Sequence, residues 1–341
     1  MYVNALSLKV KHMRIIYEMT EQNYKRISDL IRRGQYTALQ DFLDVSITNQ
    51  LYLEEQALDR SHPAKRGPKS AARDQIETVK EFKEFGRNWG RVLTVEPVPV
   101  ESLGTQFMPF SNRIFPAKVA ARVLCNTLGE NQTVDYGVYA EVVSHVAVGL
   151  GTYLKSIDRK QGRSFRLEAL STGLPAAKRG DQKIAVRRFL EHVVGGSRHA
   201  GEYHGMLFTL GLVGMPRAGQ MGITVDGLQF AELVNPVLDR PESEYGELKS
   251  CLAREEADFY MTLVKKRLPE EARTVEIIRE IVRSKHSYPE ICAEFTRTIS
   301  LTQEQVNVEQ RVSTELARMR ELSLVLSRAE GLKTYYDVPA Q

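Results

Sequence analysis

The apolar positions near the N-terminus change their spacing at Thr20. Met13 to Met19 is a run rich in strand-forming residues, without proline or glycine, and it predicts a β-strand. After Thr20, which can cap a helix, apolar residues recur every three or four positions as far as Ile31. Gly34 ends this pattern, and Thr37 can cap a second helix whose buried side consists of Leu39, Phe42, Leu43, Ile47 and Leu51. The predicted order is strand, helix, glycine turn, helix.

The next part of the chain is polar and basic, and then becomes extended. Residues 57–75 contain few apolar positions but several cations, prolines and glycines, and we interpret them as a basic linker. Residues 76–114 are expected to form a helix and an extended connection. Pro97 and Pro99 exclude a helix from the second part of that segment.

Residues 115–240 are predicted to form helices followed by a β-hairpin. The apolar spacing indicates helices over 115–128, 136–154, 184–194 and 198–210. Ser197 is the expected N-cap of the last of these helices. Two short apolar runs between 212 and 227 flank a turn that contains glycine and proline, which is typical of a hairpin.

Residues 250–341 repeat this order. Helices are predicted over 272–282 and 289–299, and a third helix should follow a capping-box pattern formed by Thr302 and Gln305. The buried stripe of this third helix consists of Val308, Val312, Leu316 and Met319. The runs 324–328 and 333–338 then form a second hairpin with Gly331 near its tip. The fold class that we expect is therefore mainly α with short β-hairpins.

The predicted N-terminal strand has no partner within its own unit, so its backbone groups would remain unpaired in a monomer. Pairing with the same strand of a second copy solves this problem. Residues 10–56, with the strand, Thr20, the Gly34 turn and Thr37, resemble the ribbon-helix-helix family of DNA-binding repressors. The resemblance implies a homodimer whose paired strands form a ribbon in the major groove.

The same resemblance implies an outward row on the ribbon that contacts DNA: His12, Arg14, Ile16 and Glu18. The helix that begins near Thr37 would bind a phosphate with its amide groups. Arg14 suits guanine, but Ile16 offers no hydrogen bond and Glu18 repels phosphate. A ribbon that joins two copies without reading sequence is the alternative.

Helices followed by a hairpin resemble the winged helix, a form of helix-turn-helix, over both 115–240 and 250–341. The resemblance implies DNA contacts from the last helix and the hairpin of each unit. In the middle unit these residues are Arg198 and Arg217. In the C-terminal unit they are Arg311, Thr314 and Arg318, which are expected to lie opposite the apolar stripe of the helix, Asn307 and Gln310 nearer its start, and Arg328 and Lys333 on the hairpin. For the C-terminal helix, the alternative is a solvated charged face. For the middle unit, the alternative is a structural or protein-binding role.

Composition adds limits to this picture. The chain has 341 residues, enough for two or three domains, and its formal net charge of +4 permits contact with nucleic acid without requiring it. In the linker, Lys65, Arg66 and Lys69 could lie along a phosphate backbone, or the segment could be a plain tether. Three widely spaced cysteines favour a reducing cytoplasm, and no apolar run reaches membrane length.

No motif of a catalytic, metal or nucleotide site stands out, and neither enzyme activity nor a cofactor is expected. We therefore expect a cytoplasmic, nucleoid-associated protein that binds double-stranded DNA, a homodimeric transcriptional regulator. The alternatives are a plasmid-partition or antitoxin-like protein, and an adaptor subunit that binds protein within a larger assembly.

Overall fold

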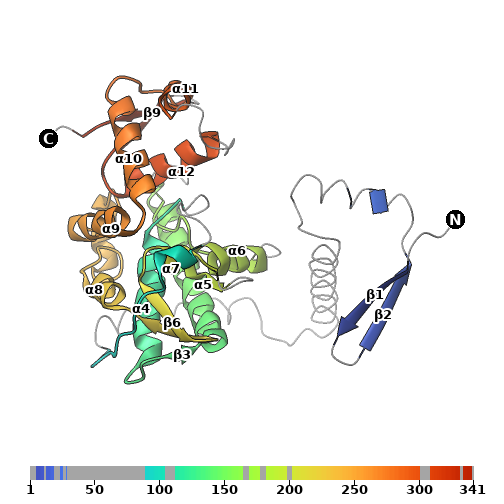
Figure 1. Ribbon diagram of the computed structural model, residues 1–341. Helices are drawn as coiled ribbons and strands as arrows, with labels where there is room; N and C mark the ends of the chain where they lie inside the picture. Colours follow the sequence, from blue (N-terminus) through green and yellow to red (C-terminus); the bar gives the residue numbers. More distant parts are fainter. Residues whose placement is uncertain are drawn as a thin grey trace. The chain divides into compact units, whose positions relative to one another are not determined.

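The computed structural model describes residues 5–10, 13–18, 24–25, 28, 89–103, 112–163, 169–176, 182–197, 202–299, 308–330 and 333–339. The chain divides into two compact units, residues 1–70 and 71–341. The described part is mainly helical with small sheets, which confirms the expected fold class at this coarse level. Figure 1 gives the order of the elements along the chain.

The first unit contains a β-hairpin whose first strand was not predicted from the sequence. Strand β1 (Ala5–Val10) pairs antiparallel with β2 (Met13–Glu18), from Ala5 opposite Glu18 to Val10 opposite Met13. The strand at 13–18 is confirmed, but the prediction that it has no partner within the chain is wrong. Tyr24, Lys25 and Ser28 are helical, as expected. His12, Thr37, the second predicted helix and the basic linker with Lys65, Arg66 and Lys69 lie outside the described residues.

The second unit begins, in its described part, with an extended segment that leads to a short 3-10 helix, η1 (Val100–Ser102). The helices of its first core are α4 (Phe115–Leu128), α5 (Tyr136–Lys160), α6 (Gln182–Phe189), α7 (Met206–Thr209), α8 (Val225–Glu232), η4 (Glu242–Glu247) and α9 (Arg254–Arg267), with a π-helical turn, η2 (Leu190–Val194), after α6. Its strands are β3 (Val134–Asp135), β4 (Gly196–Ser197), β5 (Tyr203–His204), β6 (Val213–Arg217) and β7 (Gln220–Ile223).

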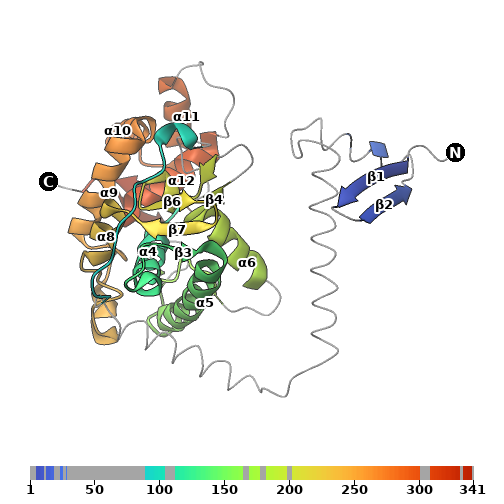
Figure 2. The same ribbon diagram turned by 60° about the horizontal axis from the view of Figure 1, so that its bottom comes forward.

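Helix α4 is the centre of this core. Almost every residue of α4 is buried, and the helix contacts α5, α7, α8, η2 and β7. Strands β3, β7 and β6 form one sheet, seen side by side in Figure 2, and β6–β7 is the hairpin predicted between 212 and 227. The extended segment crosses this hairpin, where Val95 N donates to the Ile223 carbonyl at 2.8 Å. A Cβ at Gly214 would lie 2.0 Å from the Glu96 carbonyl oxygen, so only glycine permits this crossing.

The helix predicted over 198–210 is wrong. Ser197 does not cap a helix but belongs to β4, which pairs antiparallel with β5. Only Met206–Thr209 is helical in the described part of that segment, because Gly205, with a φ of 92°, starts a new turn there. In its described part, residues 202–210, the chain therefore has no long helix before the β6–β7 hairpin, where a recognition helix was expected.

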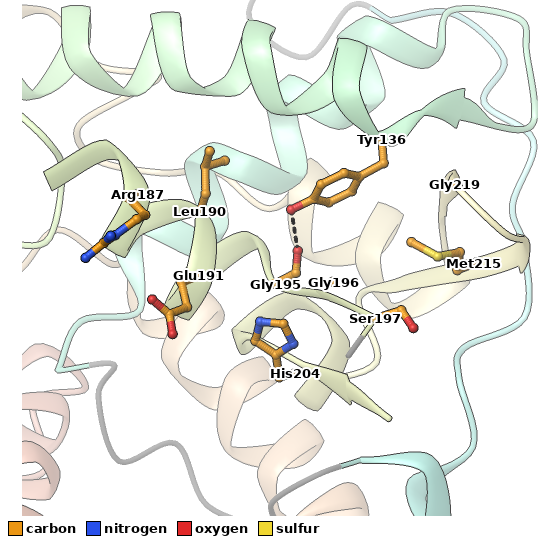
Figure 3. A pocket seen from close by; sticks show the side chains of 10 residues that line it. All are labelled: Tyr136, Arg187, Leu190, Glu191, Gly195, Gly196, Ser197, His204, Met215 and Gly219. Carbon is orange, nitrogen blue, oxygen red and sulfur yellow. Dashed lines mark hydrogen bonds between the residues drawn. The ribbon is translucent and has the colours of Figure 1, made fainter. Parts of the chain in front are cut away.

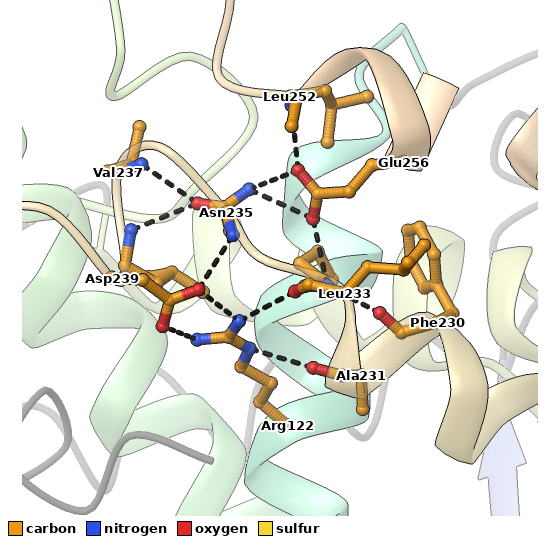
Figure 4. A network of polar contacts seen from close by, with 12 residues as sticks. Arg122, Phe230, Ala231, Leu233, Asn235, Val237, Asp239, Leu252 and Glu256 are labelled. Atoms are coloured by element: carbon orange, nitrogen blue, oxygen red, sulfur yellow. Dashed lines mark hydrogen bonds and ion pairs between the residues drawn. The ribbon is translucent and has the colours of Figure 1, made fainter. Parts of the chain in front are cut away.

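A network of buried ions holds α4 to the end of α8, to the segment that follows α8, and to α9 (Figure 4). Lys118 Nζ lies 2.9 Å from Glu256 Oε1, and both side chains are fully buried. Lys118 also donates to the Leu233 carbonyl at 2.7 Å. One turn later, Arg122 binds both oxygens of Asp239, at 2.7 and 2.6 Å. Every charge in this network has an opposite charge and further hydrogen bonds, the condition under which buried ions are tolerated.

A second core is formed by the last five elements: α10 (Pro269–Val282), α11 (Tyr288–Thr298), α12 (Val308–Glu321), β8 (Leu326–Glu330) and β9 (Lys333–Asp337). These helices and the hairpin match the predicted ones closely; the Thr302–Gln305 capping box lies outside the described residues. The first core continues through α9 to Leu268, so it runs past the domain boundary expected between 240 and 250.

The two cores are joined at the end of α12. The Glu321 carboxylate accepts hydrogen bonds from Ile114 N at 2.6 Å and Phe115 N at 3.1 Å, so a side chain of α12 supplies the cap that the N-terminus of α4 lacks locally. The three cysteines, Cys125, Cys251 and Cys292, are buried free thiols. Among the described helices, none is both long enough and apolar enough to cross a membrane.

Candidate nucleic-acid interface

The C-terminal elements are connected by a small sheet as well as by their core. Ser287, which lies between α10 and α11, forms an antiparallel bridge with Tyr335 of β9. Beside it, Tyr336 N donates to the His286 carbonyl at 2.8 Å. The order is therefore helix, bridge, helix, helix, strand, strand, with β9 between the bridge and β8. Figure 1 shows α10, α11, α12 and β9 together at one end of the second unit.

Helix α12 is buried on two faces. Of its predicted stripe, Val312, Leu316 and Met319 are fully buried, and Val308 is partly buried. The neighbouring face, which packs against α10, is buried as well: Arg318 is only 2% exposed, and its guanidinium lies 3.3 Å from Glu271 Oε1. Arg318 also forms an ion pair with Glu315, one turn earlier on α12.

The prediction that Arg311, Thr314 and Arg318 form an exposed face is therefore wrong. Thr314 is 8% exposed. Arg311 is half-buried, donates a hydrogen bond to Thr274 Oγ1 of α10, and places its guanidinium 5.7 Å from the centre of the Phe295 ring. The physical reason is the position of α10, which covers a second side of α12 and offers Glu271 and Thr274 as partners.

The buried ions of this face have shifted pKa values. Burial raises the pKa of Glu315 to about 7, although Arg318 acts in the opposite direction, and the charge of Glu271 raises it further. Burial also raises the pKa of Glu321. For Arg318, burial acts to lower the pKa, but Glu271 and Glu315 outweigh it and the net shift is upward. These groups hold α12 in place from inside, and they are not available to a ligand.

The face of α12 that remains open consists of Glu309, Gln310 and Ser313, with Ala317 and Arg320 half-exposed further along. A groove of about 760 Å³ runs beside it. Ser313 and Arg320 line the groove from α12, Lys333 to Tyr336 line it from β9, and Ser287 to Glu290 line it from the start of α11. Of these residues, only Lys333 was predicted from the sequence as a DNA contact. The spacing of positions 313, 317 and 320 indicates one helix face, but the same spacing fits several faces of this helix.

The charges around the groove are mixed. Lys333 is exposed, and Arg320 lies near enough to Tyr336 to oppose the rise that burial causes in the pKa of that phenol. Arg328 of β8 is exposed but lies 2.5 Å from Glu330 and 3.4 Å from Asp337. Glu290, hydrogen-bonded to the side chain and backbone of Ser287, has a lowered pKa and so stays ionised. One cation of the groove, Lys333, therefore lies on β9, the other, Arg320, lies on α12, and a carboxylate lies at the start of α11.

The remaining predicted contacts do not join this surface. Arg217 is exposed on β6, in the first core. Arg198 and Asn307 lie outside the described residues, while Arg14, Ile16 and Glu18 belong to β2 in the other unit. In the described part of the chain, no group of three or more His, Cys, Asp or Glu residues is placed to hold a metal ion.

Comparison with known proteins gives no match to a family model, to a curated protein or to a solved structure.

Proposed function

We propose that residues 269–338 form a winged helix that binds double-stranded DNA, and that the chain is a transcriptional regulator. The observation that carries this proposal is the Ser287–Tyr335 bridge. It holds the segment between the first and second helices beside β9, at the place where a winged helix has a short strand. In this class of fold, the third helix enters the major groove and the hairpin contacts the backbone.

The structure changes which residues we assign to the contact. Gln310 and Ser313 are the polar side chains on the open face of α12, and glutamine and serine both suit the edges of bases. Lys333, across the groove on β9, and Arg320, at the end of α12, are the cations placed for phosphates. The binding role of Arg311, Thr314 and Arg318 is withdrawn, since these side chains hold the helix in its own core.

We still propose that the chain forms a homodimer through the first unit. The reason is no longer an unpaired strand, since β2 pairs with β1, but the small size of this hairpin. A two-stranded hairpin is marginally stable in isolation and needs a further strand or a covering layer. Pairing of the β1–β2 hairpin with that of a second copy would supply such a strand and would place two reading helices on one duplex. An association with the nucleoid follows from the same proposal.

The test is binding of the full chain to a random-sequence duplex. Fluorescence anisotropy measures the binding constant at several salt concentrations. The logarithm of the binding constant should fall linearly with the logarithm of salt concentration. Lys333→Ala should reduce the slope by about one unit, as expected for one lost phosphate contact. Arg254→Ala, which removes an exposed cation at the start of α9, is the matched control and should leave the slope unchanged. Absence of binding at low salt would refute DNA binding.

A second candidate is an adaptor whose winged helix binds protein. It is favoured by the acidic residues on the same elements, since Glu290 at the start of α11 and Glu309 on α12 are both exposed and would repel phosphate. For this candidate, Glu309→Gln should weaken capture of a basic partner, whereas for the DNA-binding reading it should strengthen binding to duplex. Anisotropy with the duplex distinguishes the two candidates: a higher affinity of Glu309→Gln for the duplex supports DNA binding, and an unchanged affinity does not.

A further inference from the structure

The outer side of α6 carries a group of cations. Helix α6 contacts α5 and continues into the π-helical turn η2. On its inner side, Phe189 is buried and Ala185 and Val186 are half-buried. The exposed positions share the opposite side of the helix, because they recur one and four residues apart. They are Lys183, Ile184, Arg187, Arg188 and Glu191. The three cations of this set, Lys183, Arg187 and Arg188, are called the α6 basic face below.

The side chain of Arg187 is directed away from the first core. A pocket of about 570 Å³ lies beside α6 and η2, and Tyr136, Gly196 and Met215 line its inner part. There the Tyr136 hydroxyl donates to the Gly195 carbonyl at 2.7 Å, a hydrogen bond drawn in Figure 3. The guanidinium group of Arg187 points away from these residues in the same view. Arg187 is exposed, so its charge faces solvent and is open to a partner outside the chain.

The two arginines of this face are not used by the fold. Among the residues that the structure describes, the guanidinium groups of Arg187 and Arg188 have no ion pair or hydrogen bond. Other surface arginines differ: Arg283 and Arg297 each form an ion pair with a glutamate three residues earlier in the chain. Arg187 does not pair with Glu191, although that residue follows one helical turn later. Both guanidinium groups therefore keep all their donors for a ligand.

The arrangement of these charges is unfavourable for the helix itself. Lys183 and Arg187 are four residues apart, and like charges at this spacing destabilise a helix. Attraction to the C-terminal end of the helix dipole does not account for the arginines, because the helical stretch continues through η2 to Val194 and leaves them in its interior. An anionic partner on the α6 basic face removes the repulsion.

We propose that the α6 basic face is a second contact to the phosphate backbone of the duplex, an inference that rests on the proposed DNA binding by the winged helix. Guanidinium groups bind phosphate through two parallel hydrogen bonds, and such contacts fix a protein on DNA without reading its sequence. Helices α6 and α12 belong to the same unit and reach the same side of it in Figures 1 and 2. A contact by α6 therefore extends the surface that one duplex covers.

The test is fluorescence anisotropy of the full chain with a random-sequence duplex of about two helical turns, roughly 20 base pairs, at several salt concentrations. Arg187→Gln combined with Arg188→Gln should reduce the slope of log K against log salt by about two units, one for each lost phosphate contact. The matched control combines Arg254→Gln with Lys265→Gln, which removes two exposed cations of α9 and should leave the slope unchanged. Thermal melts check that both double variants are folded.

The outcomes separate this inference from the proposed function. If wild type binds and the folded α6 variant keeps the wild-type slope, or if the control loses as much, the α6 contact is refuted and the winged helix is not. If the α6 variant lowers the slope and Lys333→Ala does not, the α6 contact holds and the groove loses its assignment. Absence of binding by wild type at low salt overturns both.

Vesicles of anionic phospholipid, compared with vesicles of neutral phospholipid, test the other polyanionic surface. The proposal predicts no binding to anionic vesicles that depends on the α6 basic face. Binding to anionic vesicles that the α6 double variant abolishes, together with an unchanged slope on DNA, would assign this face to lipid headgroups and overturn the proposal.

Discussion

The pair formed by Lys118 and Glu256 is fully buried in the first core. Burial lowers the pKa of Lys118 to about 8, against the opposing attraction of Glu256, and burial raises the pKa of Glu256. Burial thus disfavours the charged form of both Lys118 and Glu256, and the opposite charge of the partner favours it. Asn235, which donates to Glu256 Oε2 at 2.9 Å, supports the arrangement.

A double-mutant cycle tests this coupling. Lys118→Met leaves the Glu256 carboxylate buried without its cation and should lower the free energy of unfolding by about 3–5 kcal/mol. Combining it with Glu256→Gln should recover a large part of that loss, because no uncompensated charge remains. Urea denaturation of the four proteins gives the interaction energy. Additive effects of the two substitutions would contradict the coupling.

Glu315 predicts a dependence of stability on pH. Burial raises its pKa to about 7 in the folded protein, from an ordinary value of 4.5. Between these two values the folded state keeps a proton that the unfolded state has released. The free energy of unfolding should therefore fall as the pH rises through this window.

The measurement is urea denaturation at several pH values, which we expect to show a smaller fall for Glu315→Gln than for wild type. Glu255→Gln, an exposed carboxylate on α9, is the control and should follow the wild-type curve. If the free energy of unfolding falls equally with pH in wild type and in Glu315→Gln, the Glu315 carboxyl is not the group that keeps a proton in the folded state.

At the scale of elements, Glu321 makes α12 part of both cores. Its carboxylate caps α4, while Met319, on the same turn of helix, lies in the second core. Loss of such a buried acceptor leaves two backbone N–H groups without a partner. The element that carries the proposed DNA-contacting face is in this way fixed to the central helix of the molecule.

Glu321→Ala should reduce the free energy of unfolding by about 1–3 kcal/mol and separate the unfolding of the two cores. Trp89, the single tryptophan, lies in the first core, so its fluorescence reports that core, whereas circular dichroism reports all helices. The two signals should coincide in wild type and diverge in the variant. Glu276→Ala, at an exposed position on α10, should keep them together; coincident signals in Glu321→Ala would contradict the prediction.

Elements defined by local patterns were predictable from the sequence. The apolar spacing located α10 and α11, and glycine turns located the hairpins β6–β7 and β8–β9. The outward face of α12 was not predictable, because Arg318 finds its partner Glu271 on another helix, 47 residues earlier. A charged residue opposite an apolar stripe shows the same sequence pattern whether its side chain is solvated or forms an ion pair with a carboxylate on another helix.

Two other differences have a similar cause. Ser197 follows two glycines, as an N-cap often does, but pairing of β4 with β5 determines the fold there. The pocket in the first core is lined by residues such as Arg187, Glu191 and Met215, which carry no motif and come from segments that are far apart in the sequence. In both cases the decisive contact is non-local.

At the scale of the whole molecule, the first unit is expected to join two copies. Sedimentation of the full chain at micromolar concentration should give a dimer, and deletion of residues 1–56 should give a monomer. The second unit is compact by itself, so the shortened chain should still melt cooperatively. If the shortened chain is folded and still dimeric, the interface lies in the second unit. If the full chain is a monomer, the prediction of a dimer is wrong.

The central claim is that the open face of α12, and not its buried arginines, reads DNA. Selection of bound sequences from a randomised duplex library, with the full chain as bait, tests it most directly. Wild type should enrich a defined sequence, and Gln310→Ala should relax the preference at particular positions, with a loss of about 1–3 kcal/mol on the selected site and little change on scrambled DNA. If the preference survives both Gln310→Ala and Ser313→Ala, or if wild type enriches no sequence, the claim is contradicted.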